Sequence, residues 1–331
     1  MMETVLDIRG LTTCFHTRKG TVRAVDGVDL SVSRGETLGV VGESGCGKSV
    51  MALSVLRLIP SPPGEICGGT VRLHGQNVLA LSRREMIKIR GNRISMIFQE
   101  PMTSLNPVYT VGFQLQEVLI KHRAMKRAAA RAEAQNMLAL VGIPDPAARL
   151  DDYPHQMSGG MRQRVMIAMA LCCKPDVMIA DEPTTALDVT IQAQILALIK
   201  RLKEEIGMAV ILITHDLGVI AETAQRVAVM YAGKVVEQAS VHGLFGRPMH
   251  PYTVGLFMSL PRIGGQSGQL TPIPGVVPSL SELPPGCAFQ ARCSRAQDKC
   301  RTVEPPLEEK IAEHLCRCHF PVLDARAARF A

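Results

Sequence analysis

The chain has 331 residues, of which 47% are hydrophobic and 20% charged, and its formal net charge is +7. This composition is typical of a globular protein of about two domains. No apolar run approaches the ~18 residues that a membrane-spanning helix requires, and the first residues lack the pattern of a signal peptide. With no Trp and four Tyr, the chain has few rings on which nucleic-acid bases could stack. We expect a soluble cytoplasmic protein that binds no nucleic acid but can dock on a membrane protein.

Strands and helices are predicted to alternate along the first 260 residues. Alternating or continuous apolar residues predict strands at 6–9, 28–32, 37–41, 70–73, 94–98, 177–180 and 209–213. Helical spacing predicts helices at 50–56, 165–171 and 189–203, and a helical insert at 111–141. This order predicts an α/β fold with a parallel sheet. Five prolines in residues 271–285 predict a linker before a cysteine-rich tail.

A glycine-rich loop follows the strand predicted at 37–41. It matches the pattern G-x-x-x-x-G-K-[ST] in full, with a helix starting at Val50: Gly42, Glu43, Ser44, Gly45, Cys46, Gly47, Lys48 and Ser49. Strand, loop and helix form the context of a phosphate-binding loop, because the glycines let N–H groups face the phosphates and the helix N-terminus adds its dipole. Lys48 is expected to reach the β- and γ-phosphates of a nucleoside triphosphate, and Ser49 to ligate Mg²⁺. A turn that binds nothing is the alternative, which the pairing of Lys48 with Ser49 disfavours.

Two carboxylates follow the strand predicted at 177–180. Asp181 is expected in the Mg²⁺ shell, and Glu182, one residue further, is expected to face the γ-phosphate. There it could orient or polarise the attacking water. A pair of charges at a strand end is common by itself, but a phosphate-binding loop upstream in the same chain favours the catalytic interpretation.

The segment at residues 158–164 reads Ser-Gly-Gly-Met-Arg-Gln-Arg and precedes an apolar helix. Ser158 can cap that helix and the glycines leave N–H groups open, which predicts a second anion-binding helix terminus. The segment resembles the signature motif of the ATP-binding cassette family. Three further motifs of this family have counterparts here: Gln99 resembles the Q-loop glutamine, residues 186–188 the D-loop ending in Asp188, and His215 the switch histidine.

The resemblance covers residues 1 to about 260. It implies a P-loop NTPase with a RecA-like core, an N-terminal antiparallel β subdomain and a helical subdomain at about 99–165. It implies ATP and Mg²⁺ as cofactors, with Gln99 as a further Mg²⁺ ligand and His215 as a sensor of the γ-phosphate. It also implies two cassettes packed head to tail, so that signature and D-loop residues of one cassette complete the site of the other: Ser158, Gly159, Gly160, Gln163 and Asp188. Phe15 is the candidate for stacking on adenine, although it could instead be a core residue.

Within the family, residues 99–107, 182–190 and 250–253 resemble the D-type ATP-binding subunit of dipeptide and oligopeptide importers. That resemblance implies a heterodimer with a homologous F-type ATPase, two transmembrane permeases and a periplasmic or extracellular peptide-binding protein. It also implies a peripheral position on the cytoplasmic face of the inner membrane. Importers of nickel, glutathione or antimicrobial peptides share these motifs, so the substrate stays open. A soluble cassette ATPase acting on nucleic acid is disfavoured, because only about 110 residues separate loop and signature.

Five of the ten cysteines lie in the last 45 residues. In a cytoplasmic protein such clustering favours a metal site over disulfides. With Cys318 as the fourth ligand, which the resemblance of its Cys-His-Phe-Pro segment favours, the spacing is C-x5-C-x6-C-x17-C. Four such thiolates suit either Zn²⁺ or an iron–sulfur cluster: Cys287, Cys293, Cys300 and Cys318. The family resemblance implies a [4Fe-4S] cluster in a C-terminal extension at 261–331. Cys316 is the alternative to Cys318 as fourth ligand.

Overall fold

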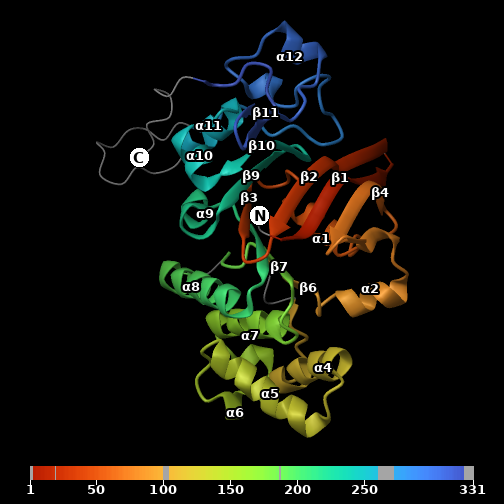
Figure 1. Ribbon diagram of the computed structural model, residues 1–331, viewed down its shortest axis with the longest axis vertical. Helices are drawn as coiled ribbons and strands as arrows, with labels where there is room; N and C mark the ends of the chain where they lie inside the picture. Colours follow the sequence, from red (N-terminus) through yellow and green to blue (C-terminus); the bar gives the residue numbers. More distant parts are fainter. Residues whose placement is uncertain (1–2, 19, 100–103, 186–187, 260–271, 324–331) are drawn as a thin grey trace. The chain divides into compact units, whose positions relative to one another are not determined.

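The computed structural model describes residues 3–18, 20–99, 104–185, 188–259 and 272–323 (Figure 1). The chain divides into two compact units, each assembled from separate segments. The first unit holds residues 1–6, 31–37 and 72–213, and the second holds residues 7–30, 38–71 and 214–331. Among the described residues, no helix has both the length and the apolar character needed to cross a membrane.

The first unit contains a parallel sheet of three predicted strands. They lie in the order β8 (Ala209–Ile213), β7 (Val177–Asp181) and β6 (Ile94–Ile97). Every residue of β7 and β8 is buried. Parallel strands covered on both faces carry continuous apolar runs instead of alternating ones, which is the pattern in the sequence. Helix α8 (Val189–Ile206) connects β7 to β8 and buries an apolar stripe that includes Ile195, Leu198 and Leu202.

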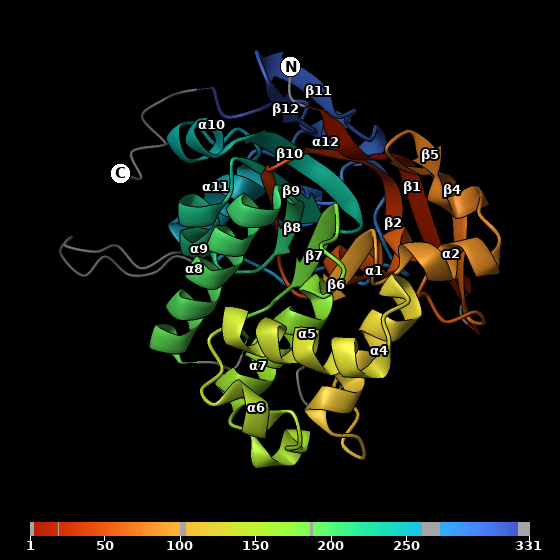
Figure 2. The ribbon, with the colours of Figure 1, turned by 60° about the horizontal axis from the view of Figure 1, so that its bottom comes forward.

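Four helices of the first unit form one group, and the first two of them fall in the helical insert predicted at 111–141. They are α4 (Val111–Arg123), α5 (Arg127–Leu140), α6 (Pro146–Arg149) and α7 (Gly159–Leu171). Figure 2 shows them packed as one group, with α7 next to β6. Ala130 and Ala134 of α5 are fully buried, since their small side chains allow close helix packing. The unit also holds β5 (Gln76–Asn77), helix α2 (Arg83–Ile89) and short 3-10 turns at Val78–Ala80 and Pro154–Gln156.

The second unit contains a sheet that the C-terminal tail extends. Its strands lie in the order β11 (Glu308–Ile311), β12 (His314–Cys316), β10 (Lys234–Ser240), β9 (Arg226–Tyr231) and β3 (Thr37–Val41). Strand β3 pairs parallel with β9, and β12 pairs antiparallel with β10, where Glu237 lies opposite Cys316. No strand is predicted from the sequence at β11 or β12, because these short polar segments have no apolar period.

A four-stranded sheet, mostly in the second unit, has the order β2 (Gly20–Ser33), β1 (Thr4–Thr17), β4 (Gly64–Leu73) and β5. The strands predicted at 6–9, 28–32 and 70–73 fall within these longer strands. Cys14 of β1 and Cys67 of β4 are paired as a disulfide. The helices of the second unit are α1 (Lys48–Val55), α9 (Leu217–Thr223), α10 (Val241–Gly246), α11 (Pro251–Met258) and α12 (Asp298–Thr302), with a 3-10 turn at Gln290–Arg292.

Candidate nucleotide-binding site

The glycine-rich loop of the second unit joins β3 to α1, as predicted. Its glycines are required where they stand: a Cβ on Gly42 would lie 2.2 Å from the Met230 carbonyl oxygen, and one on Gly47 would lie 2.3 Å from that of Ala24. Both also have positive φ angles, of 155° and 103°, in a region that residues with a Cβ rarely adopt. The loop can therefore follow this path only because Gly42 and Gly47 have no Cβ, which leaves room for the neighbouring backbone.

The start of α1 has the features of an anion site. Gly47 at the N-cap has no side chain to bond the first N–H groups, and the first turn of this fully described helix contains no acidic residue. Ser44 and Gly45 are exposed, and Ser49 and Val50 are half-buried. Open N–H groups and the positive end of the helix dipole together favour a bound phosphate.

Lys48 lies at the centre of the loop and is only 5% exposed. Its ammonium donates hydrogen bonds to the carbonyl oxygens of Gly42 at 2.7 Å and Glu43 at 3.0 Å. The Cys46 thiol is also buried, and burial raises its pKa, so it remains a neutral thiol at neutral pH. The positive charge of Lys48 is thus held inside the loop, next to the open helix terminus.

Two other predicted residues lie in the second unit. Phe15, in β1, is half-buried, and its ring lies against Gly64, where an added Cβ would be 3.0 Å from Cε1. His215 is exposed and follows Thr214, whose N–H donates to the Val40 carbonyl at 3.2 Å. That bond holds the segment of His215 beside the strand that enters the loop.

The predicted hydrolytic residues of the first unit lie at the carboxyl end of β7. Asp181 is 3% exposed and ends the strand. Glu182 has a φ of +46°, a left-handed conformation that is uncommon for Glu and typical of functional sites. Its carboxylate accepts hydrogen bonds from Gln99 at 3.0 Å and from the Thr185 hydroxyl at 2.8 Å. The structure therefore brings Gln99 and Glu182 together although they are 83 positions apart in the sequence.

The signature segment forms the N-terminus of α7 in the first unit. Ser158 is the N-cap, is exposed, and accepts a hydrogen bond from the Met161 N–H at 3.3 Å. Gly159 and Gly160 are half-buried. Gln163 is 2% exposed and donates to the Pro183 carbonyl at 2.5 Å, which ties the signature helix to the segment after Glu182. Asp188, exposed, caps α8 in the same way.

Some predicted features lie outside the described residues. These are Ala186 and Leu187 of the D-loop, residues 100–103 of the Q-loop passage, and the domain boundary near residue 260.

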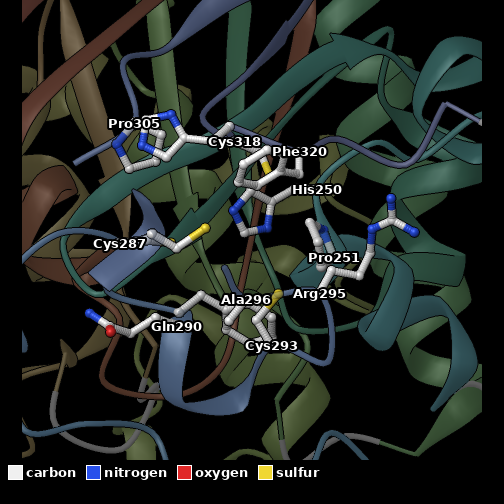
Figure 3. A pocket seen from close by; sticks show the side chains of 13 residues that line it. His250, Pro251, Cys287, Gln290, Cys293, Arg295, Ala296, Pro305, Cys318 and Phe320 are labelled. Atoms are coloured by element: carbon white, nitrogen blue, oxygen red, sulfur yellow. The ribbon is translucent and has the colours of Figure 1, made fainter. Parts of the chain in front are cut away.

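The four cysteines predicted as ligands line one cavity of the second unit. Cys287, Cys293 and Cys318 surround it together with His250 and Phe320 (Figure 3). Cys300 is a further lining residue. Burial and neighbouring thiols raise the pKa of Cys287 and Cys293, and raise that of Cys318 to about 11. Cys316 is buried in β12 and is not part of the lining. Across the described ranges, no three His, Cys, Asp or Glu side chains are already spaced as ligands of one metal ion.

Comparisons with known proteins agree with these motifs. Residues 25–185 match the ABC transporter family model, and residues 236–300 match that of the oligopeptide/dipeptide transporter C-terminal region. A probable peptide ABC transporter ATP-binding protein of Sinorhizobium fredii is 57% identical over 96% of this chain and 95% of its own. The dipeptide transport ATP-binding protein DppD of Bacillus subtilis is 52% identical over the same shares. This chain belongs to the ABC transporter family, among the ATP-binding proteins of its oligopeptide/dipeptide branch.

A solved structure also resembles the chain. It is the dimeric structure of a post-hydrolysis state of an ATP-binding cassette bound to ADP and Pi. That cassette is 30% identical in sequence, and it superposes with a TM-score of 0.64 over 71% of this chain and 98% of its own. The predicted α/β fold is thus confirmed as that of an ABC ATPase.

Three residues that contact the ABC motifs were not predicted from the sequence as site residues. Thr185 holds the Glu182 carboxylate, and Arg292 and Tyr252 both contact Glu43 of the loop. Thr185 and Tyr252 lie within the segments 182–190 and 250–253, whose resemblance indicates the dipeptide and oligopeptide branch. Arg292 stands beside Cys293 and gave no signal of its own.

Proposed function

We propose that this chain is the ATP-binding and ATP-hydrolysing subunit that powers import of dipeptides or oligopeptides through an ABC transporter. The observation that carries the proposal is the complete phosphate-binding loop, with Lys48 held beside an open helix terminus, in a chain of this family. The names of its relatives support peptides as the substrate class.

The site residues divide the work of hydrolysis. Lys48 and the N–H groups of the loop bind the β- and γ-phosphates, and Phe15 stacks on adenine. Glu182 polarises the attacking water, and its hydrogen bonds from Gln99 and Thr185 orient its carboxylate. His215 senses the γ-phosphate. The hydroxyl, amide and carboxylate of Ser49, Gln99 and Asp181 are the oxygen ligands that Mg²⁺ prefers, and Mg²⁺ neutralises the phosphate charge.

The signature helix supplies a phosphate site to a second cassette. Ser158 and Gly160 are at an accessible helix N-terminus and are proposed to contact the γ-phosphate bound by the partner cassette. The dimeric form of a similar cassette supports this arrangement. We propose that the partner is a homologous F-type ATPase. ATP then favours the closed pair, because only closure adds the Ser158 contact.

The helical insert is the proposed docking surface for the two permeases. Tyr109 and Phe113 are 46% and 49% exposed, and their rings stack with centroids 4.6 Å apart. An exposed aromatic pair of this kind favours burial against a partner. Contact with permeases would place the chain at the cytoplasmic face of the inner membrane, with a peptide-binding protein on the other side.

The cysteine cavity is proposed to hold a [4Fe-4S] cluster. Four cysteines line one cavity, and four thiolates are the usual ligands of such clusters. We propose Cys318 as the fourth ligand, since Cys316 does not line the cavity. The cluster would crosslink the short tail segments. Anaerobic preparations should contain iron and acid-labile sulfide in equal amounts. Cys318→Ser should lose both, and the matched Cys316→Ser should retain them; zinc without sulfide would contradict the cluster.

Glu182→Gln tests the proposed function. The variant should keep its affinity for Mg²⁺–ATP while its ATP turnover falls on the order of 100-fold, because the general base is lost. Exposed Glu205→Gln is the matched control and should leave both values unchanged. Reconstituted with its permeases in proteoliposomes, the wild-type chain should drive ATP-dependent dipeptide uptake. Unchanged turnover in Glu182→Gln would remove Glu182 from its role, and ATP hydrolysis without peptide uptake would contradict the substrate.

A further inference from the structure

Glu43, the second residue of the phosphate-binding loop, is held by two side chains from the C-terminal part of the second unit. Its carboxylate accepts two hydrogen bonds from the Arg292 guanidinium, at 2.7 and 3.0 Å. Its backbone N–H donates to the Tyr252 hydroxyl at 2.8 Å. The two contacts fix both the side chain and the backbone of one loop residue. They reach it across 249 and 209 positions of sequence.

Arg292 is itself rigidly placed. Its side chain is only 5% exposed, and Nε donates to the Pro274 carbonyl at 3.0 Å. Its guanidinium carbon lies 5.9 Å from the ring centroids of both Tyr231 and Phe289. A guanidinium that is fixed by its neighbours and donates to both carboxylate oxygens fixes the orientation of the carboxylate as well as neutralising its charge. Arg292 therefore positions Glu43 and is not a mobile surface cation.

Tyr252 is equally constrained. It is fully buried, and its ring packs against Tyr231 and Phe289 with centroids 4.7 and 5.5 Å apart. The start of its helix, α11, is fixed by His250, whose Nδ1 accepts from the Tyr252 N–H at 3.0 Å. The hydroxyl is thus presented to the loop by a rigid aromatic cluster.

The contacts bear on the phosphate-binding lysine. The carbonyl of Glu43 is one of the two that accept from the Lys48 ammonium, so the position of Glu43 helps to set where that charge lies. We infer that Arg292 and Tyr252 are positioning residues for nucleotide binding: they preorganise the loop, and through Arg292 the C-terminal extension raises the affinity for ATP. This inference rests on the proposed function of the loop. Neither residue belongs to the phosphate-binding loop; both act through Glu43.

Equilibrium binding of a fluorescent ATP analogue with Mg²⁺, well below the unfolding temperature, tests the inference on the full-length chain. Arg292→Gln should raise Kd and the KM for ATP roughly tenfold, because the loop must then be ordered by the nucleotide itself, and kcat should stay within twofold. Arg292→Lys keeps the charge but not the paired contact, so its Kd should lie between those of the wild type and Arg292→Gln. Arg131→Gln is the matched control, because it breaks an exposed Arg–Asp pair of the same geometry in the first unit and should bind as wild type.

A double-variant cycle with Glu43→Gln separates positioning from direct contact. If Arg292 acts only through Glu43, the double variant should bind no more weakly than either single variant. Additive losses of binding free energy in the double variant would overturn the inference. A wild-type Kd in Arg292→Gln would also overturn it, even if the Tm of that variant fell, because Arg292 would then only stabilise the extension. If neither the wild-type chain nor Arg131→Gln bound any nucleotide, the proposed function would be contradicted, and the inference that rests on it would fail as well.

Discussion

Gly47→Ala tests the claim that close backbone packing shapes the phosphate-binding loop. The new Cβ would lie 2.3 Å from the Ala24 carbonyl oxygen, at a φ of +103°. The positive φ alone costs about 1–2 kcal/mol for a residue with a Cβ, and the overlap with backbone must be relieved by moving the loop. Gly27→Ala is the matched control, because Gly27 has a φ of +64° but nothing within 4 Å of an added Cβ.

The two variants should therefore separate strain from collision. Gly27→Ala should lose about 1 kcal/mol of unfolding free energy and bind ATP normally. Gly47→Ala should lose more unfolding free energy than Gly27→Ala. If binding requires the loop to be restored at a cost of about 2 kcal/mol, ATP should bind roughly 30-fold more weakly. Urea unfolding and titration with a fluorescent ATP analogue measure the two quantities. Equal stability losses, with wild-type affinity in Gly47→Ala, would refute the reasoning.

Three further predictions concern the first unit. Ser158→Ala should cost about 1 kcal/mol of stability and, under the proposed function, most of the ATPase activity; Thr110→Ala, which removes the N-cap of α4, should cost similar stability and no activity. Gln163→Ala should destabilise by about 1–3 kcal/mol, because it leaves the buried contact to Pro183 unmade; urea unfolding beside exposed Asn136→Ala is the check, and equal midpoints would contradict it. Burial raises the pKa of Cys172 to about 12, so its thiol should resist iodoacetamide at pH 8 in the native protein and react in urea; native labelling found by peptide mapping would contradict this.

Much of this molecule could be predicted from its sequence because the signals are local. The loop from Gly42 to Ser49 needs particular backbone angles and donors within eight consecutive residues, and the parallel strands are continuous apolar runs. The helices of the insert follow from the helical spacing of residues 111–141. The crowding of cysteines into the tail indicated a shared site, and the family resemblance picked out the four that line one cavity.

Only the tertiary structure decided how distant segments act on these motifs. The contacts of Arg292 and Tyr252 with Glu43, and of Gln99 with Glu182, join residues 83 to 249 positions apart. The addition of β12 to β10 likewise depends on an existing strand edge, not on any apolar pattern in residues 314–316. A hydrogen bond between remote side chains leaves no periodicity in either segment. Its existence is set by the packing that brings the two segments together.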